Sequence, residues 1–338
     1  MKNFKKKILF RVDAGGEIGL GHFYRSVNLV GLLIKRGHEV TIIHLPSDFW
    51  SLIPETDLLH LSLTSDDCEE EMLKIFYMLK PDIFYVDGII SFTEFFIEQI
   101  KKTSKVVFYQ NLSDSKHLCD VFILPSIHQN EVFFKSFKKF NTLIFKGLEY
   151  FTFNSRISQI EQKKISLDNK VRQIAVMAGG SDPANILLRF YNMVKISRLL
   201  EVFSFTFFYG TDYLFKDSIP REPERNVSFC LFDAENILKN DMLVATFGVS
   251  AYEFMYLGVP VLGIGHQESN TKALEVLAKK TGGIYNLGLI DNLSSELLNE
   301  TFDYLIRNPH LLKEQVINAW ACLDLMGIER VTTILEDL

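Results

Sequence analysis

The stretch Phe10–Arg25 reads FRVDAGGEIGLGHFYR, an apolar run that leads into a glycine-spaced loop and then a histidine. This order predicts a strand, a loop and a helix that begins near His22. Glycines such as Gly19 and Gly21 let the backbone approach a ligand, and the free N–H groups at a helix start favour an anion. A histidine, whose ordinary pKa is about 6.5, can take or give a proton at neutral pH. The simpler interpretation is a tight turn with a structural histidine.

Apolar runs alternate with segments of helical spacing through the first half of the chain. Strands are expected at 8–12, 40–45, 83–88, 105–109 and 121–125, with helices at 23–36, 68–79 and 92–102. Continuous apolar strands separated by helices predict an α/β fold whose parallel sheet is covered on both faces. Ligands bind such a sheet outside the carboxyl ends of its strands. Asp13, His22 and Asp87 fall at or just beyond such ends.

The alternation stops at the polar and charged segment 153–170 and then restarts. Strands are expected at 173–177, 203–209, 226–231, 242–246 and 260–264, with helices at 185–195, 235–239, 248–257 and 271–281 and a helix-rich end at 294–338. A chain of 338 residues is long enough for two domains. We expect an N-terminal Rossmann-like domain at 1–152, a linker at 153–170, and a C-terminal Rossmann-like domain with terminal helices at 171–338.

Charge and cysteine usage exclude several classes of protein. The formal net charge of −6 argues against a nucleic-acid partner, because such proteins neutralise phosphates with clustered Lys and Arg. No apolar stretch has membrane-spanning length, and the run Ile8–Phe10 ends too early for a signal peptide. The four cysteines lie far apart without CxxC spacing, so neither a metal site nor a disulfide is expected. These features predict a soluble, cytoplasmic protein.

A second glycine loop follows the strand expected at 173–177. Gly179, Gly180, Ser181 and Asp182 stand between that strand and a helix. Backbone N–H groups and a hydroxyl in this position would face an incoming anion. The second domain therefore carries a candidate phosphate site in its first loop.

The helix expected at 248–257 begins with a similar arrangement. Gly248 and Ser250 form a turn that can face a diphosphate, and Glu253, one turn later, can hold ribose hydroxyls. The alternative interpretation is a capping box, Ser-x-x-Glu, in which the same side chains only close the helix start.

A polar loop with His266, Gln267 and Asn270 follows the strand expected at 260–264 and precedes a helix. Two glycine-rich anion sites and one polar loop in the second half accompany a histidine-bearing loop in the first. This combination predicts an enzyme with a cleft, in which one half grips a nucleotide diphosphate and the other presents the reacting group.

Ordered motifs over most of the chain resemble the PseG/SpsG-like nucleotide-sugar hydrolases. They are Phe10-Arg11-x-Asp13, Ile18-Gly19-x-Gly21-His22-x-x-Arg25, Gly179-Gly180-Ser181-Asp182-Pro183, Ser250-Ala251-Tyr252-Glu253, Leu257-Gly258-Val259-Pro260 and Asp324-x-x-Gly327-x-x-Arg330-Val331. The resemblance implies a GT-B architecture, with two Rossmann-like domains facing a central cleft. It also implies hydrolysis of a UDP-linked diacetamido-trideoxy-altrose in pseudaminic acid biosynthesis, with neither a metal nor another cofactor.

The resemblance also implies roles for single residues. His22 would be the general base that activates water for attack at the anomeric carbon. The sugar pocket would be lined by Asp13, Gly19, Gly21, Arg25, Asp87 and Tyr150. UDP would be held by Gly179, Gly180, Ser181, Asp182, Gly248, Ser250 and Glu253.

Three places depart from the family pattern. Asp87-Gly88-Ile89 stands where the family has Asp-His-Tyr, His266-Gln267 stands where it has Asn-Gln, and Asn154 follows the Gly147–Tyr150 segment where an arginine is usual. The nucleotide half keeps the pattern better than the sugar half. The resemblance therefore says least about which sugar is bound.

Two other functions fit the same residues. His266-Gln267-x-x-Asn270 resembles the donor loop of MurG-type transferases. A GT-B glycosyltransferase would use the same cleft and base to deprotonate a hydroxyl of a glycan or lipid acceptor. A nucleotide-sugar sensor without turnover is a third hypothesis, because the sugar-side residues are altered and fold does not fix function.

Overall fold

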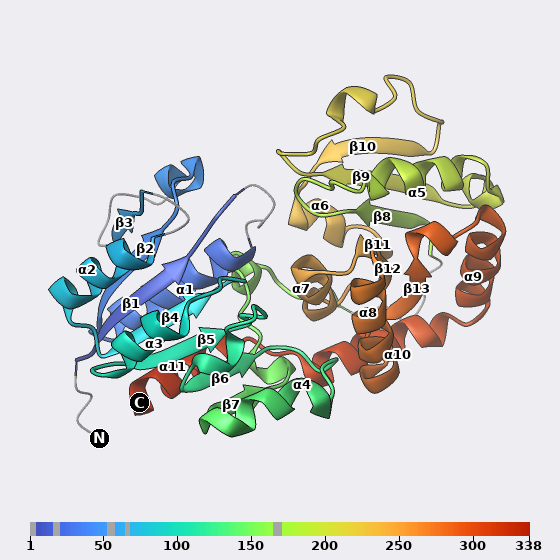
Figure 1. Ribbon diagram of the computed structural model, residues 1–338. Helices are drawn as coiled ribbons and strands as arrows, with labels where there is room; N and C mark the ends of the chain where they lie inside the picture. Colours follow the sequence, from blue (N-terminus) through green and yellow to red (C-terminus); the bar gives the residue numbers. More distant parts are fainter. Residues whose placement is uncertain (1–4, 16–20, 53–57, 65–67, 165–170) are drawn as a thin grey trace. The chain divides into compact units, whose positions relative to one another are not determined.

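The computed structural model describes residues 5–15, 21–52, 58–64, 68–164 and 171–338 (Figure 1). The chain folds as two compact units, Met1–Ser155 with Leu325–Leu338 and Arg156–Asp324. Each unit is built around one parallel sheet, which confirms the predicted α/β fold class. Within the described ranges, no helix is both long and apolar enough to span a bilayer.

The first unit holds seven parallel strands in the order β3-β2-β1-β4-β5-β6-β7. The strands are β1 (Lys7–Val12), β2 (Glu39–His44), β3 (Leu59–Ser62), β4 (Ile83–Asp87), β5 (Lys105–Tyr109), β6 (Val121–Leu124) and β7 (Leu143–Lys146). The helices are α1 (Gly21–Lys35), α2 (Glu69–Leu79), α3 (Glu94–Lys101), α4 (Glu131–Lys135) and α11 (Gly327–Asp337).

Alternate side chains of β1 enter two separate cores. Phe10 and Val12 pack on one face of the sheet with Phe23 of α1. Leu9 packs on the other face with Phe96 of α3. Burial of both faces explains why four of the six residues of this strand are apolar.

The order of strands in the first sheet reverses between β1 and β4. From β1 the chain passes to β2 and β3 on one side and then returns to β4, which pairs with β1 from Ile8↔Ile83 to Val12↔Asp87. Open α/β sheets bind ligands at such a reversal, outside the carboxyl ends of the two strands. The loop after β1 leads to His22, and Asp87 is the last residue of β4.

The second unit holds six parallel strands in the order β10-β9-β8-β11-β12-β13, with the reversal between β8 and β11. The strands are β8 (Gln173–Met177), β9 (Ser204–Tyr209), β10 (Val227–Leu231), β11 (Met242–Thr246), β12 (Val261–Gly265) and β13 (Tyr285–Leu289). The helices are α5 (Ile186–Lys195), α6 (Ala234–Leu238), α7 (Val249–Leu257), α8 (Glu268–Thr281), α9 (Ser295–Arg307) and α10 (Pro309–Cys322).

The predicted division into domains at 1–152 and 171–338 puts the last helix in the second domain, whereas in the structure it belongs to the first unit. In Figure 1, α11, drawn in red, lies against the sheet of the first unit, and its Val331 joins the core beside α1. A Cβ atom at Gly327 would lie 2.0 Å from the carbonyl oxygen of Phe151, so only glycine allows this close approach. Arg330 Nη1 donates to the carbonyl oxygen of Glu149 at 2.8 Å. The C-terminal motif therefore docks α11 onto the first unit.

Candidate functional site

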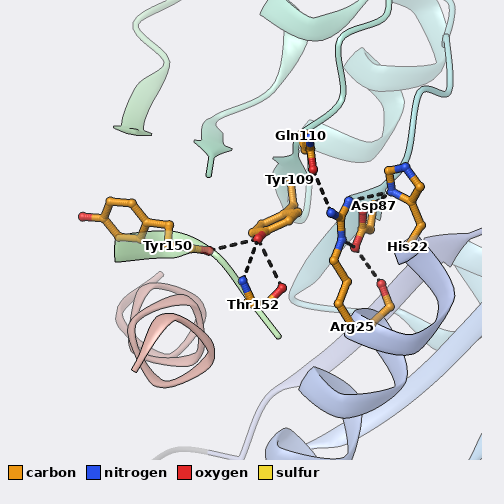
Figure 2. Close-up of polar contacts among 8 residues, drawn as sticks. His22, Arg25, Asp87, Tyr109, Gln110, Tyr150 and Thr152 are labelled. Atoms are coloured by element: carbon orange, nitrogen blue, oxygen red, sulfur yellow. Dashed lines mark hydrogen bonds and ion pairs between the residues drawn. The ribbon is translucent and has the colours of Figure 1, made fainter. Parts of the chain in front are cut away.

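His22 and Asp87 meet at the reversal of the first sheet (Figure 2). His22 is the second residue of α1, and its Nδ1 lies 2.7 Å from Oδ1 of Asp87. The next residue, Gly88, has a φ of +134°, a conformation that favours glycine. A Cβ atom there would lie 4.0 Å from His22 Nδ1. The positive φ therefore explains why a glycine stands at position 88, where the pattern of the PseG/SpsG-like hydrolases has a histidine.

Asp87 is buried and both of its oxygens have protein partners. Oδ2 accepts hydrogen bonds from Arg25 Nε at 2.7 Å and Ser26 Oγ at 2.8 Å, and Oδ1 faces His22 and Arg25 Nη2. Burial by itself raises the pKa of the Asp87 carboxyl, but the charge and hydrogen bonds of Arg25, with His22, lower it to about 2. Asp87 is therefore an anion at neutral pH.

His22 Nδ1 lies between an acceptor and a donor, Asp87 Oδ1 at 2.7 Å and Arg25 Nη2 at 2.6 Å. When Nδ1 carries a proton it donates to Asp87, and Nε2 of the neutral ring then has a free lone pair. When Nδ1 is bare it accepts from Arg25, and Nε2 carries the proton. No described residue hydrogen-bonds to Nε2, and the side chain is 19% exposed. Nε2 is therefore the ring nitrogen that a ligand can reach.

Arg25 is held by side chains from β4 and from the end of β5. Its Nη1 donates to Gln110 Oε1 at 2.7 Å, and its Cζ lies 4.8 Å from the centre of the Tyr109 ring. Burial lowers the pKa of Arg25, but Asp87 outweighs burial and raises it. All three guanidinium nitrogens thus have protein partners.

Tyr150 and Asp13, two other predicted sugar-side residues, do not join this group. Figure 2 shows the Tyr150 ring pointing away from Asp87, while its carbonyl oxygen accepts from the Tyr109 hydroxyl at 2.9 Å. Asp13 is buried, forms an ion pair with Arg11 and accepts from the backbone N–H of Leu45. Gly21 begins α1, whereas Gly19 lies outside the described residues.

Sequence reasoning missed Ser26, Tyr109 and Gln110 as parts of the site. Ser26 lies one turn into α1, and the other two close or follow β5, the neighbour of β4. For Tyr109 and Gln110, the only sequence signal is a position at or after the carboxyl end of an expected strand. Such a position is shared by every strand and does not single out these residues.

The second sheet has an open backbone at its own reversal. Cβ atoms at Gly179, Gly180 and Gly248 would meet nothing within 4 Å. Gly179 has a φ of +82°, which favours glycine. Gly210, after β9, presses on the loop, because a Cβ atom there would lie 2.2 Å from the carbonyl oxygen of Gly180. The backbone of Gly210 thus packs against the loop after β8. The glycines of this loop leave open space where their side chains would be.

Asp182 has a structural partner at the start of α5. Its carboxylate accepts from the backbone N–H groups of Ile186 and Leu187, each at 2.9 Å. Burial raises the pKa of this carboxyl to about 6, although these two hydrogen bonds oppose the shift. The protein's own side chain therefore occupies the anion-binding end of α5. A direct contact between Asp182 and UDP remains a prediction.

The capping-box interpretation of Ser250 and Glu253 is wrong. The N-cap of α7 is Gly248, with no side-chain cap, and Ser250 lies inside the first turn. The Ser250 hydroxyl therefore does not cap the N-terminus of α7. Glu253 is buried in the next turn of the helix. Their predicted contacts with UDP are left as predictions.

The predicted polar loop after β12 is shorter than expected. α8 begins at Glu268, so that His266 and Gln267 are exposed loop residues and Asn270 lies in the first turn of the helix. Asn270 Oδ1 is buried and has no hydrogen-bond partner in the described structure. An unpaired buried acceptor is costly, and a donor from a ligand would relieve that cost.

Among the described residues, no group of three or more His, Cys, Asp or Glu side chains could hold a metal ion.

No protein-family model matches the chain. An uncharacterized protein of Methanocaldococcus jannaschii is 23% identical over 292 residues, which cover 81% of this chain; the chain spans 58% of that relative's length. The spore coat polysaccharide biosynthesis protein SpsG of Bacillus subtilis is 22% identical over 339 residues, which cover 96% of each chain.

Solved structures of glycosyltransferases resemble the whole chain. The glycotransferase of kitacinnamycin has a TM-score of 0.73 at 14% identity, with 98% of each chain covered. MurG of Acinetobacter baumannii has a TM-score of 0.66 at 13% identity, covering 98% of this chain and all of its own. A glycosyltransferase of Rickettsia africae also reaches 0.66 at 13% identity, with 98% of each chain covered. The chain therefore has a GT-B-type fold of two Rossmann-like domains.

Replacing Asp87 by Asn should destabilise the chain by about 3–5 kcal/mol at pH 7, because it leaves Arg25 buried without its counter-charge. The pKa of Asp87 is about 2 in the folded chain, below the ordinary value of about 3.9. Its contribution to stability is therefore complete above pH 4 and disappears as the pH falls through about 2.

Urea unfolding of the wild type and of Asp87→Asn should show a stability gap that narrows by about 1 kcal/mol between pH 6 and pH 3. Asp303→Asn is the matched control, because Asp303 is an exposed carboxylate of α9. A gap that stays constant over this pH range would contradict the assignment of an ionised, paired Asp87.

Proposed function

We propose that the chain hydrolyses a UDP-linked sugar, with His22 as the general base. One observation carries this proposal: His22 Nδ1 is engaged by Asp87, and Nε2 has no partner among the described residues, at the reversal of the first sheet. A histidine held in this way presents one free, basic nitrogen at the place where α/β sheets bind ligands.

In the proposed reaction, a water oxygen attacks the anomeric carbon of the sugar and gives its proton to His22 Nε2. The bond between that carbon and the β-phosphate oxygen breaks, and UDP leaves with the electron pair. The imidazolium that forms keeps its Nδ1–H hydrogen bond to Asp87, whose negative charge stabilises it. Arg25 serves as a positioning residue, since its nitrogens are occupied by Asp87 and Gln110.

The second unit would bind the nucleotide. Gly179, Gly180 and Gly248 leave the backbone open at the reversal of the second sheet, where N–H groups can approach a diphosphate. Glu253 would hold the ribose, and His266, Gln267 and Asn270 would contact the donor side, as the MurG-type resemblance implies. The diphosphate of the leaving UDP would then be bound mainly by backbone N–H groups.

The resemblance to PseG/SpsG-like hydrolases supports the choice of a UDP-linked acetamido sugar as the first substrate to test. The similarity to SpsG, named for spore coat polysaccharide biosynthesis, agrees with a role in glycan synthesis. The enzyme would need no metal, because the base is a side chain and the leaving group is held by N–H donors.

A GT-B glycosyltransferase is the second candidate, favoured by neighbours such as MurG that resemble the chain over its whole length. His22 would then deprotonate the hydroxyl of a glycan or lipid acceptor in place of water. Release of UDP only after such an acceptor is added would favour the transferase.

His22→Ala should lower UDP release from the best nucleotide sugar of a panel, assayed with water alone, by at least about 100-fold. The loss is expected in kcat, because the base acts in the transition state and not in binding. His310→Ala, at an exposed histidine of α10, is the control and should keep full turnover. Full turnover by His22→Ala would exclude His22 as the base.

Gly180→Leu should weaken UDP binding at least about tenfold, a loss of about 1.4 kcal/mol, without destabilising the chain. A Cβ atom at Gly180 would meet no atom within 4 Å, and the leucine side chain would extend into the space assigned to phosphate. Gly31→Leu on α1, where a Cβ atom also meets nothing, is the control. UDP titrations by calorimetry measure both, and unchanged affinity in Gly180→Leu would place the diphosphate elsewhere.

A further inference from the structure

Gln110 has a backbone conformation that side chains rarely adopt. It follows the last residue of β5 and has a φ of +51°, in the left-handed region. For a residue other than glycine this region is strained, and such residues cluster at ligand sites. The surrounding structure fixes it there, because its backbone N–H donates to the carbonyl oxygen of Ile123 at 2.8 Å.

The orientation of the Gln110 amide is set by Arg25. A guanidinium can only donate, so the group 2.7 Å from Arg25 Nη1 must be the amide oxygen, Oε1. The amide nitrogen, Nε2, is then directed away from Arg25. It has two N–H groups and no partner in the part of the chain that the structure describes. Gln110 therefore presents two oriented donors.

The same guanidinium fixes these donors beside the proposed base. Arg25 Nη1 contacts Gln110, and Arg25 Nη2 contacts His22 Nδ1 at 2.6 Å. Figure 2 shows His22 and Gln110 on two sides of this guanidinium. Asp87, the last residue of β4, orients the base, and Gln110, which follows the adjacent strand β5, offers donors at the same edge of the sheet.

From this arrangement we infer that Gln110 is a sugar-binding residue, whose Nε2 donates to an oxygen of the sugar in the nucleotide-sugar substrate. The inference rests on the proposed function for the substrate class. A fixed donor of this kind binds a hydroxyl or an acetamido carbonyl oxygen, and it discriminates against a sugar that lacks the acceptor. UDP alone lacks the sugar that is attached to the β-phosphate in the substrate, so it gains nothing from this contact.

Gln110→Glu tests the role most sharply. The carboxylate keeps an acceptor for Arg25 but replaces the two donors with a second acceptor, which repels a sugar oxygen. Gln110→Met, which is similar in length, removes both functions and guards against effects of the new charge. Gln99→Glu, on α3 and next to Lys102, is the control for adding a carboxylate to this unit.

Calorimetry should be run with UDP and with the UDP-sugar that the wild type binds most tightly among UDP-N-acetylglucosamine, UDP-glucose and UDP-galactose. We expect both Gln110 variants to lose at least about tenfold in affinity for the UDP-sugar, with UDP affinity unchanged within twofold, and Gln99→Glu to match the wild type. Thermal unfolding checks that each variant is folded.

Two results would overturn the inference: variants that bind the UDP-sugar as the wild type does, or a wild type that binds no UDP-sugar more tightly than UDP. Failure of the hydrolase proposal gives a different result. In that case the wild type binds the UDP-sugar and the Gln110 variants lose affinity, but no UDP is released in water.

Discussion

The buried ion pair between Arg25 and Asp87 is the interaction on which the first site depends. It joins α1 to β4, and each group would be costly to bury without the other. The pair also sets the chemistry of its neighbours. A charged Asp87 can accept the Nδ1 proton of His22, and a charged Arg25 can orient the amide of Gln110. Without Arg25, burial would raise the pKa of Asp87, and His22 would lose the anion that holds its ring.

The two units use the same topology for different chemistry. In the first, the strand reversal carries charged and titratable side chains, which suit proton transfer. In the second, the reversal carries Gly179, Gly180 and Gly248, which expose backbone and suit a phosphate. This division matches the proposed substrate, a nucleotide sugar, in which the sugar reacts and the diphosphate is bound. The support for the second loop comes from Gly210, whose lack of a side chain lets two backbone segments touch.

Much of the fold could be predicted because buried parallel strands are continuous apolar runs; β8 has the bounds expected from its sequence. The edge strand β3 was missed because its exposed residues show no such run. At the site, the rule that ligands bind outside the carboxyl ends of parallel strands predicted that Asp13, His22 and Asp87 lie near one another; His22 and Asp87 meet, whereas Asp13 pairs with Arg11. The capping role of Asp182 depends on the exact start of α5, and the role of Gln110 depends on a contact with Arg25, so neither follows from sequence pattern.

In the proposed reaction, His22 directs water to the anomeric carbon of a UDP-sugar. The most direct test is hydrolysis in water enriched in oxygen-18, with the products weighed by mass spectrometry. We expect one heavy oxygen in the released sugar and none in UDP, because the bond that breaks is between the anomeric carbon and oxygen. Heavy oxygen in the β-phosphate of UDP would mean attack at phosphorus and would exclude the proposed reaction.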